Sequence, residues 1–308
     1  MAEPASNGGR VQLIVQPTDG IKAVVDAVDK ATKTVDIIIF RFDLKPLEKS
    51  IEAGVRRGVA VRALIAHTNR GGEKGLRQLE QRLLQTGATV SRTAGDLVRY
   101  HGKMMIIDRE ELYVNGFNFT ARDLASRSFG LVTRDRRIVQ EALRLFESDA
   151  QREDFEPDNQ GFVVSPENAR EELATFIKRA KKQLVIWDPK VGDTQMLRLL
   201  AQRQKAGVDI RIIGKVGKRG GDLRVQKLPG MRLHVRAIVR DGEAAFVGSQ
   251  SLRALELDAR REVGLITKDA KVVKGLLDTF EADWVKTELG KKELKAHEKE
   301  LALAEVAS

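Results

Sequence analysis

The chain has 308 residues, 42% of them hydrophobic and 32% charged, a composition typical of one large or two medium globular domains. Its formal net charge of +10 leaves two interpretations open: solubility alone, or an anionic partner such as nucleic acid or an acidic membrane surface. The absence of cysteine excludes disulfides, thiolate catalysis and cysteine-ligated zinc.

The N-terminus and the apolar runs bear on location. Residues 1–10, MAEPASNGGR, lack the apolar core of a signal peptide. The longest apolar run, VDIIIF (35–40), is far shorter than the about 20 residues that a membrane-spanning helix needs. We therefore expect a cytoplasmic protein, and peripheral contact with a membrane stays open.

Helical and strand patterns then alternate along the chain, in the way that is typical of α/β layers. In the first part, the expected order is a helix at 20–33, a strand at 34–42, a helix at 47–58, a strand at 59–67, a hairpin at 100–120 and a helix at 136–153. In the second part, the order is a helix at 167–182, a strand at 183–189, a helix at 196–207, a strand at 208–216, a hairpin at 233–252 and a helix at 270–287.

The two parts are imperfect copies of one α/β unit. His101 and His234 are 133 residues apart (234 − 101), and so are Asp108 and Asp241 (241 − 108). The duplication predicts an N-terminal lobe at 1–153, a C-terminal lobe at 154–290 and a charged tail at 291–308. The polar, aperiodic segment at 151–161 is expected to link the lobes.

The matched segments HGKMMIID (101–108) and HVRAIVRD (234–241) carry the candidate chemistry. In each, a cation follows the histidine by two residues, Lys103 in the first copy and Arg236 in the second. If the two hairpins face each other, one imidazole can attack phosphorus while the other protonates the departing oxygen. The two cations would hold the phosphate oxygens, and this chemistry needs neither a metal nor a cofactor.

The competing interpretation is that both histidines are core residues of a structural duplication. We favour chemistry because only four histidines exist in the chain and two of them occupy the same place in both copies. Asp108 and Asp241 close the strands, and we expect them to support the local backbone rather than to react.

HGKMMIID resembles the His-x-Lys-x4-Asp motif of the phospholipase D superfamily, and the resemblance extends over residues 10–287 with its duplication. It implies two similar α/β/α lobes related by a pseudo-twofold axis, with one shared active site. It also implies His101 as the nucleophile and His234 as the acid and base. By the same resemblance, Asn118, Ser249 and Glu262 bind substrate, and Asn118 and Ser249 are expected to hydrogen-bond the opposite histidine or the phosphate.

The sequence departs from the family pattern in three places. Arg236 stands where the motif has Lys, and Ser251 stands where the Gly-Ser-x-Asn segment has Asn. The register of the two copies pairs Glu262 with Ser128, so the first copy has no matching carboxylate. Arg keeps the positive charge but is longer and planar, and we expect activity to be retained.

Three functions are compatible with these residues. The first is a phosphodiesterase that hydrolyses or transfers phosphatidyl groups of phospholipids, and the second is a nuclease of the same superfamily. The third is an inactive phosphate-binding protein. We expect a monomer. Two glycine-rich loops, 68–75 and 214–222, are expected to be surface loops, although Lys215, Lys218 and Arg219 of the second could contact an anionic group.

Overall fold

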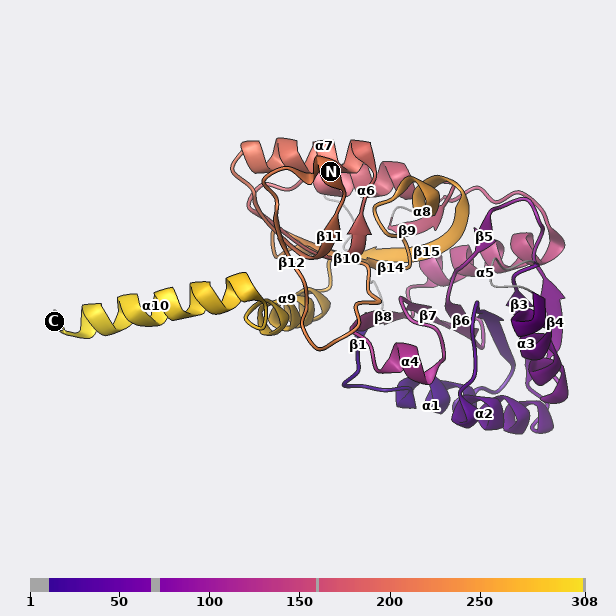
Figure 1. Cartoon of the computed structure of the whole chain (residues 1–308). Coiled ribbons are helices and arrows are strands. Elements are labelled where there is room, and N and C mark those ends of the chain that lie inside the picture. The colour runs from indigo at the N-terminus through magenta and orange to yellow at the C-terminus, as the bar shows by residue number, and fades with distance from the viewer. Residues whose placement is uncertain (1–10, 68–72, 159–160, 307–308) are drawn as a thin grey trace, which may run out of the picture.

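The computed structural model describes residues 11–67, 73–158 and 161–306, which form two α/β lobes (Figure 1). The elements of the first lobe are β1 (Gln12–Gln16), α1 (Lys22–Lys30), β2 (Thr34–Ile38), α2 (Lys45–Arg56), β3 (Ala60–Ile65), α3 (Glu73–Gln85), β4 (Thr89–Arg92), β5 (Arg99–Tyr100), β6 (Met104–Ile107), β7 (Glu111–Asn115), α4 (Ala121–Leu124), β8 (Ser128–Thr133) and α5 (Arg136–Gln151).

The second lobe repeats this order. Its elements are β9 (Phe162–Ser165), α6 (Ala169–Lys178), β10 (Gln183–Val191), α7 (Thr194–Lys205), β11 (Asp209–Val216), the 3-10 turn η1 (Lys218–Gly220), β12 (Arg224–Gln226), β13 (Ala237–Arg240), β14 (Ala244–Gly248), α8 (Ala254–Asp258), β15 (Arg260–Thr267), α9 (Ala270–Trp284) and α10 (Glu288–Val306).

The two sheets have equivalent strand orders. The first is β1-β8-β7-β6-β2-β3-β4, and the second is β12-β11-β10-β13-β14-β15-β5, in which β5 comes from the first lobe and β9 also pairs with β15. Reading the second sheet from β9 gives β9-β15-β14-β13-β10-β11-β12, which matches the first sheet strand for strand. The expected α/β fold built by internal duplication is therefore confirmed.

Local sequence explains why the matching helices and strands end where they do. Gly58 and Gly207 follow α2 and α7 with φ of 86° and 88°, a left-handed conformation that glycine adopts without a steric penalty. The strands that follow, β3 and β11, run parallel to β2 and β10. Each helix thus acts as the crossover of a strand–helix–strand unit.

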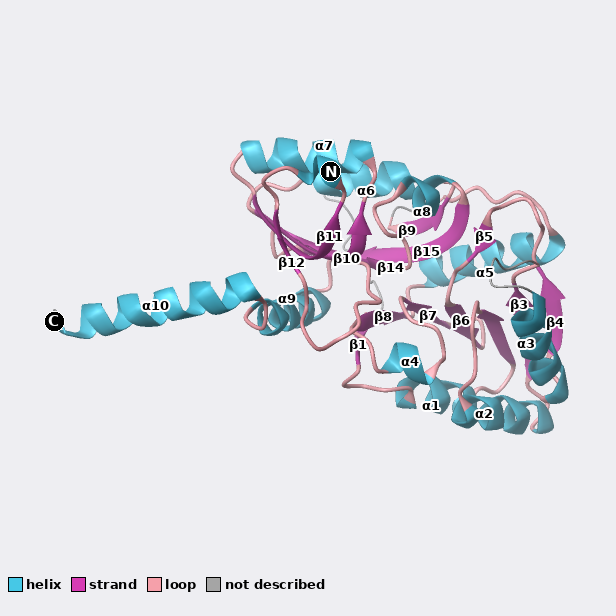
Figure 2. Cartoon of the chain, viewed as in Figure 1, coloured by secondary structure: helices cyan, strands magenta, loops and turns pink. Residues whose placement is uncertain are grey.

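One hydrophobic core joins the lobes. Buried side chains of α5 and α9 pack together with the inner faces of both sheets, and Trp187, Phe129 and Phe280 lie at their contact. Two further clusters lie on the outer faces, where α1 and α2 cover the first sheet and α6 and α7 cover the second (Figure 2). The inner faces of the two sheets thus share one core, and the lobes are bound tightly to each other.

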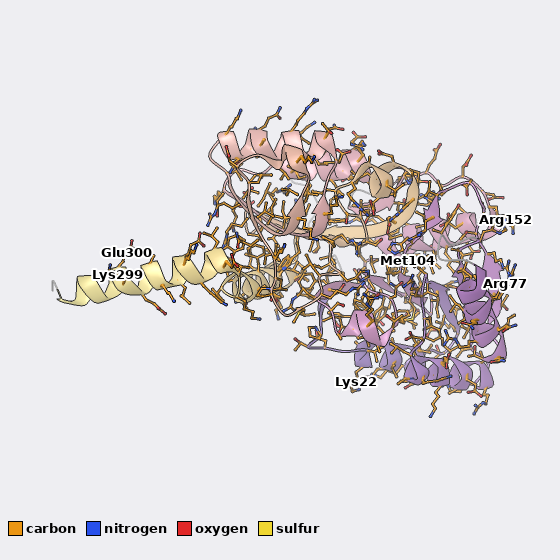
Figure 3. The ribbon with its side chains drawn as sticks, viewed as in Figure 1. Lys22, Arg77, Met104, Arg152, Lys299 and Glu300 are labelled. Atoms are coloured by element: carbon orange, nitrogen blue, oxygen red, sulfur yellow. The ribbon has the colours of Figure 1, made fainter. Side chains whose placement is uncertain are left out.

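The segment after α9 forms α10, which extends away from the body of the protein (Figure 1). Lys299 and Glu300, labelled on this helix in Figure 3, lie well outside both lobes and are exposed. Over the described residues, no helix combines the length and the apolar character that crossing a bilayer requires.

Candidate active site

The backbone of each candidate histidine is held by the other lobe. The short strand β5, which precedes His101, pairs with β15 of the second lobe, and the His101 amide donates to the Arg261 carbonyl at 2.8 Å. In the matching place, the His234 amide donates to the Arg127 carbonyl at 3.1 Å. Met104, which begins β6 just after the first histidine, lies in the middle of the molecule between the lobes in Figure 3.

Two buried ion pairs between the lobes lie next to these backbone contacts and stabilise them. Arg127 Nε and Nη2 donate to Asp283 of α9, both at 2.8 Å. Arg261 Nε donates to Asp149 of α5 at 3.0 Å. The arginines are 134 residues apart (261 − 127), as are the aspartates (283 − 149). Each pair crosses from one lobe to the other, which fixes the position of the two histidines relative to each other.

The His101 ring is oriented by a carboxylate of the second lobe. Its Nδ1 lies 2.9 Å and 3.0 Å from the two carboxylate oxygens of Glu262, and the edge of the ring meets Phe40 at 4.8 Å between centroids. A carboxylate at Nδ1 favours the tautomer with the proton on that nitrogen. The Nε2 lone pair is therefore the one available for attack.

Burial sets the charge state of this pair. It lowers the pKa of His101 to about 4, against the attraction of the Glu262 charge, so the imidazole is neutral at pH 7. Burial alone would raise the pKa of Glu262, but three influences lower it to about 2: His101, which is protonated in that acid range and also donates a hydrogen bond, the Lys103 charge, and a hydrogen bond from Ser249. The pair thus holds an ionised carboxylate and a neutral imidazole, as a nucleophile requires.

The second histidine has a carboxylate from the first lobe. Asp123 Oδ2 lies 3.5 Å from His234 Nδ1 and accepts hydrogen bonds from Asn118 Nδ2 at 2.6 Å and Asn118 N at 2.9 Å. Arg232 Nη1 donates to the other oxygen at 2.6 Å. Burial, together with the charge of Arg236, lowers the pKa of His234. Each imidazole therefore faces a carboxylate of the other lobe, at hydrogen-bond distance for His101, whereas the buried Nδ1 of His234 makes no hydrogen bond within the described residues.

Sequence comparison of the copies missed Asp123. The register opposite Glu262 led to Ser128, whose hydroxyl is buried and makes no hydrogen bond within the described residues. Asp123 instead comes from α4, in the loop between β7 and β8. Its match in the second copy, at a spacing of 133 (256 − 123), is Glu256. An acidic residue in both copies at this place was the available signal.

The charges of both cations act on both histidines. Lys103 is fully buried, and its Nζ lies 3.1 Å and 3.2 Å from the two ring nitrogens of His101. Burial lowers its pKa to about 7, although the Glu262 charge opposes this shift. The charge of Lys103 also acts on His234, and that of Arg236 on His101, so the motifs of the two lobes meet.

Arg236 has unused hydrogen-bonding capacity. Its Nε donates to Ser251 Oγ at 3.2 Å, while its Nη1 is buried and has no hydrogen-bond acceptor among the described residues. A buried guanidinium nitrogen without an acceptor is costly, because its desolvation is not compensated. Continued by one residue, the pairing of β10 with β13 puts Asp188 opposite Arg236. Asp188 is buried, but its carboxylate accepts hydrogen bonds from the Leu252 and Lys190 amides and, within the described part of the chain, not from Arg236. An anion in the site would supply the missing acceptor.

Comparisons with known proteins agree with the duplicated fold. The family model described as cardiolipin synthase, PLD-like domain, matches residues 24–150 and 173–284, which is most of the chain. The chain belongs to the phospholipase D superfamily. A comparison with curated proteins gave no match.

Two solved structures share the phospholipase D fold over nearly the whole chain. Polyphosphate kinase from Porphyromonas gingivalis has a TM-score of 0.72 at 20% identity and covers 88% of this chain. This chain spans 50% of that kinase. Phosphatidylserine synthase from Haemophilus influenzae has a TM-score of 0.72 at 11% identity, covering 91% of this chain and 87% of its own. At these identities the likeness concerns the fold alone.

The remaining residues of the phospholipase D motifs support the site from a distance. Asp108 accepts hydrogen bonds from the Thr32, Lys33 and Thr34 amides, at 2.7–3.1 Å. Asp241 binds the matching amides of residues 181, 182 and 183, at 2.7–3.0 Å. Both lie at the ends of β6 and β13 that are remote from the histidines. These bonds tie each motif strand to the start of its neighbouring strand.

Asn118 and Ser249 contact carboxylates rather than histidines. Asn118 donates to Asp123, and Ser249 Oγ accepts from the Val263 amide at 3.1 Å beside Glu262. Within the described part of the chain, no hydrogen bond joins either side chain to an imidazole, and Asn118 is connected to His234 only through Asp123. Their contact with phosphate stays a prediction.

Of the glycine-rich loops, residues 68–72 lie outside the described part of the chain. Lys215 and Lys218 of the second loop are exposed, at the end of β11 that lies toward Asp188. The Arg219 side chain does not belong to the part of the chain that the structure describes. Contact of this loop with an anionic group also stays a prediction.

Proposed function

We propose that this chain is a phosphodiesterase of the phospholipase D type that hydrolyses or transfers phosphatidyl groups of phospholipids through a phosphohistidine. The observation that carries the proposal is the buried, acceptor-free Nη1 of Arg236. It lies where the two motifs meet, each histidine having a carboxylate of the other lobe. A phosphate is the anion whose oxygens suit an arginine and a lysine together.

In the first step, Nε2 of His101 attacks phosphorus, and the bond between phosphorus and the leaving oxygen breaks. His234 gives its proton to that oxygen. Lys103 and Arg236 hold the non-bridging oxygens and stabilise the charge of the transition state. In the free protein His234 is neutral at pH 7, so we infer that it takes up a proton as the phosphodiester binds. The negative phosphodiester favours that uptake because it offsets the Arg236 charge.

In the second step, neutral His234 removes a proton from water, which attacks phosphorus and releases His101. An alcohol in place of water gives phosphatidyl transfer with the same balance of atoms and protons. Glu262 orients His101 in both steps, and Asp123 does the same for His234. Phospholipid is the proposed substrate class because the matching family is described by cardiolipin synthase.

A nuclease of the same superfamily is the second candidate, and the net charge of +10 favours it. An inactive phosphate-binding protein is the third, motivated by Arg236 in place of Lys. Retention of both histidines with their carboxylates supports an enzyme over this third candidate.

One experiment separates the candidates. Purified protein is assayed for product release from phosphatidylcholine, phosphatidylglycerol, cardiolipin and DNA, with and without EDTA. Activity on a phospholipid that His101→Ala abolishes and EDTA spares supports the proposal. His67→Ala is the matched control, because His67 is exposed and outside both motifs. Activity on DNA alone favours the nuclease, loss with EDTA contradicts the metal-free mechanism, and no product from any substrate defeats both enzyme readings.

A further inference from the structure

A basic hollow lies on the second lobe, far from the catalytic residues. Its volume is about 580 Å³, and it lies beside Asp241, where α6, α7 and the β13–β14 turn meet. At about 3.3 Å per strand residue, Asp241 is roughly 20 Å from His234 along the chain. Six cations line the hollow against two carboxylates; the cations are Lys178, Arg179, Lys181, Lys182, Arg203 and Arg240.

None of these six cations forms an ion pair within the described part of the chain. Arg203 and Arg240 donate only to the Lys178 and Phe176 carbonyls, both at 3.4 Å. Of the two carboxylates, Asp241 is already bound by three backbone amides. Asp241 and Glu243 act on Arg240, so the positive charge of the hollow is neutralised only in part, and a surplus of four positive charges (6 − 2) remains.

The internal duplication provides a control for this observation. Asp108 binds the amides of residues 32–34 as Asp241 binds those of 181–183, so the two places are equivalent. In the first lobe the positions matching the lining carry two cations and three carboxylates. They are Asp29, Lys30, Ala31, Thr32, Lys33, Gly54, Ile107, Asp108 and Glu110. Arg57 of α2 adds a third cation there, because its Nη2 donates to the Val28 and Ala31 carbonyls, so cations and carboxylates are equal in number. The fold itself thus does not require the positive charge.

We propose that this hollow is a binding site for a small anion that carries two or more phosphate groups. Its volume lies in the range of about 300–1,000 Å³ that is common for small-molecule sites. Arginine and lysine together suit phosphate oxygens, and several phosphates in one ligand match the surplus of cations. The site is separate from the catalytic one, so the inference holds whether or not the proposed reaction is right.

A concave site of this size favours a small ligand over a macromolecule. A bilayer is flat and would contact only the rim, and nucleic acid needs a basic track longer than one end of a lobe. The phosphates could belong to an inorganic polyphosphate, a nucleotide or the head group of a lipid in solution. In each case the cations would bind several phosphate groups of one small molecule. The experiment distinguishes such small ligands from a membrane surface or a DNA duplex.

The test is calorimetric titration of the full chain with inorganic tripolyphosphate, and with ATP as a second arm. Arg179→Gln/Lys182→Gln removes two exposed charges of the hollow. The matched control is Lys30→Gln/Lys33→Gln, which makes the same change of charge at the equivalent exposed positions of the first lobe. We expect the first variant to weaken tripolyphosphate binding about tenfold or more, and the control to change it less than about twofold.

Several outcomes overturn the proposal. If the wild-type protein does not bind tripolyphosphate, the proposal is wrong. It is also wrong if binding weakens equally in the two variants, because equal weakening indicates unspecific attraction. Binding of phosphatidylglycerol vesicles or duplex DNA that needs Arg179 and Lys182, without tripolyphosphate binding, assigns the surface to a macromolecule instead. Circular dichroism melts of both variants check that the charges and not the fold have changed.

Discussion

Glu262→Gln is the substitution that tests the proposed chemistry most directly. It preserves the shape of the side chain and removes the charge that faces His101 Nδ1 at 2.9 Å. A hydrogen bond to a charged group contributes about 1.5–3 kcal/mol. At about 1.4 kcal/mol per factor of ten, its loss should slow formation of the phosphohistidine by about 10- to 150-fold. The amide can also turn either its oxygen or its nitrogen to Nδ1, which leaves the tautomer unfixed.

The matched variant is Asp123→Asn, the same change beside the other histidine. The assay is a stopped-flow measurement on a p-nitrophenyl phosphodiester, whose leaving group departs without a proton. The first step then does not need His234. We expect Asp123→Asn to keep the initial burst of nitrophenolate and to slow the steady state, because His234 is needed as base in the second step.

For Glu262→Gln we expect the burst itself to slow, because His101 is the attacking group. A burst at the wild-type rate in folded Glu262→Gln protein refutes the reasoning. The reverse pattern, with the burst slowed only by Asp123→Asn, assigns the nucleophile to His234.

Three further changes have defined outcomes. Asp283→Asn leaves the buried guanidinium of Arg127 without its carboxylate, so the free energy of unfolding in urea should fall by about 3–5 kcal/mol; an unchanged urea midpoint contradicts a structural role for the pair. Arg236→Lys keeps the cation and should retain or raise activity, whereas a folded, inactive variant indicates a two-pronged phosphate contact that lysine cannot make. Because burial lowers the pKa of Lys103 to about 7, this cation is lost as pH rises through that value. The inhibition constant of a phosphodiester analogue should then rise about tenfold per pH unit above it, and a constant that is flat between about pH 6 and 9 speaks against this assignment.

The sequence alone predicted the duplication and most of the elements. The spacing of apolar residues carried this information, with a period of about 3.6 residues in helices and about two in strands. Both patterns are local, so they can be recognised without knowing the fold. The spacing of 133 residues between His101 and His234 then aligned the two copies. The elements not predicted include strands β1, β4, β9 and β12, which are short and carry no alternating pattern, and the helix α3.

The partners of the candidate site were harder to predict. Glu262 could be named by family resemblance, but its contact with His101 joins residues 161 apart in the chain. Asp123 was missed because it lies in a different place in its copy from Glu262, so comparison of the copies could not pair them. The two cross-lobe ion pairs were missed for a related reason, since their residues lie on helices and strand ends that look ordinary in sequence.

The sequence by itself thus determined which residues are candidates for chemistry: two histidines, each followed by a cation, in two copies of one α/β unit. Only the tertiary structure decided how these residues are combined. Each histidine takes its backbone contact and its carboxylate from the other lobe, and six cations of the second lobe that form no ion pair within the described part of the chain gather at one hollow. Local patterns specify the faces of helices and strands. The pairing of groups more than a hundred residues apart depends on how the two sheets pack on one shared core.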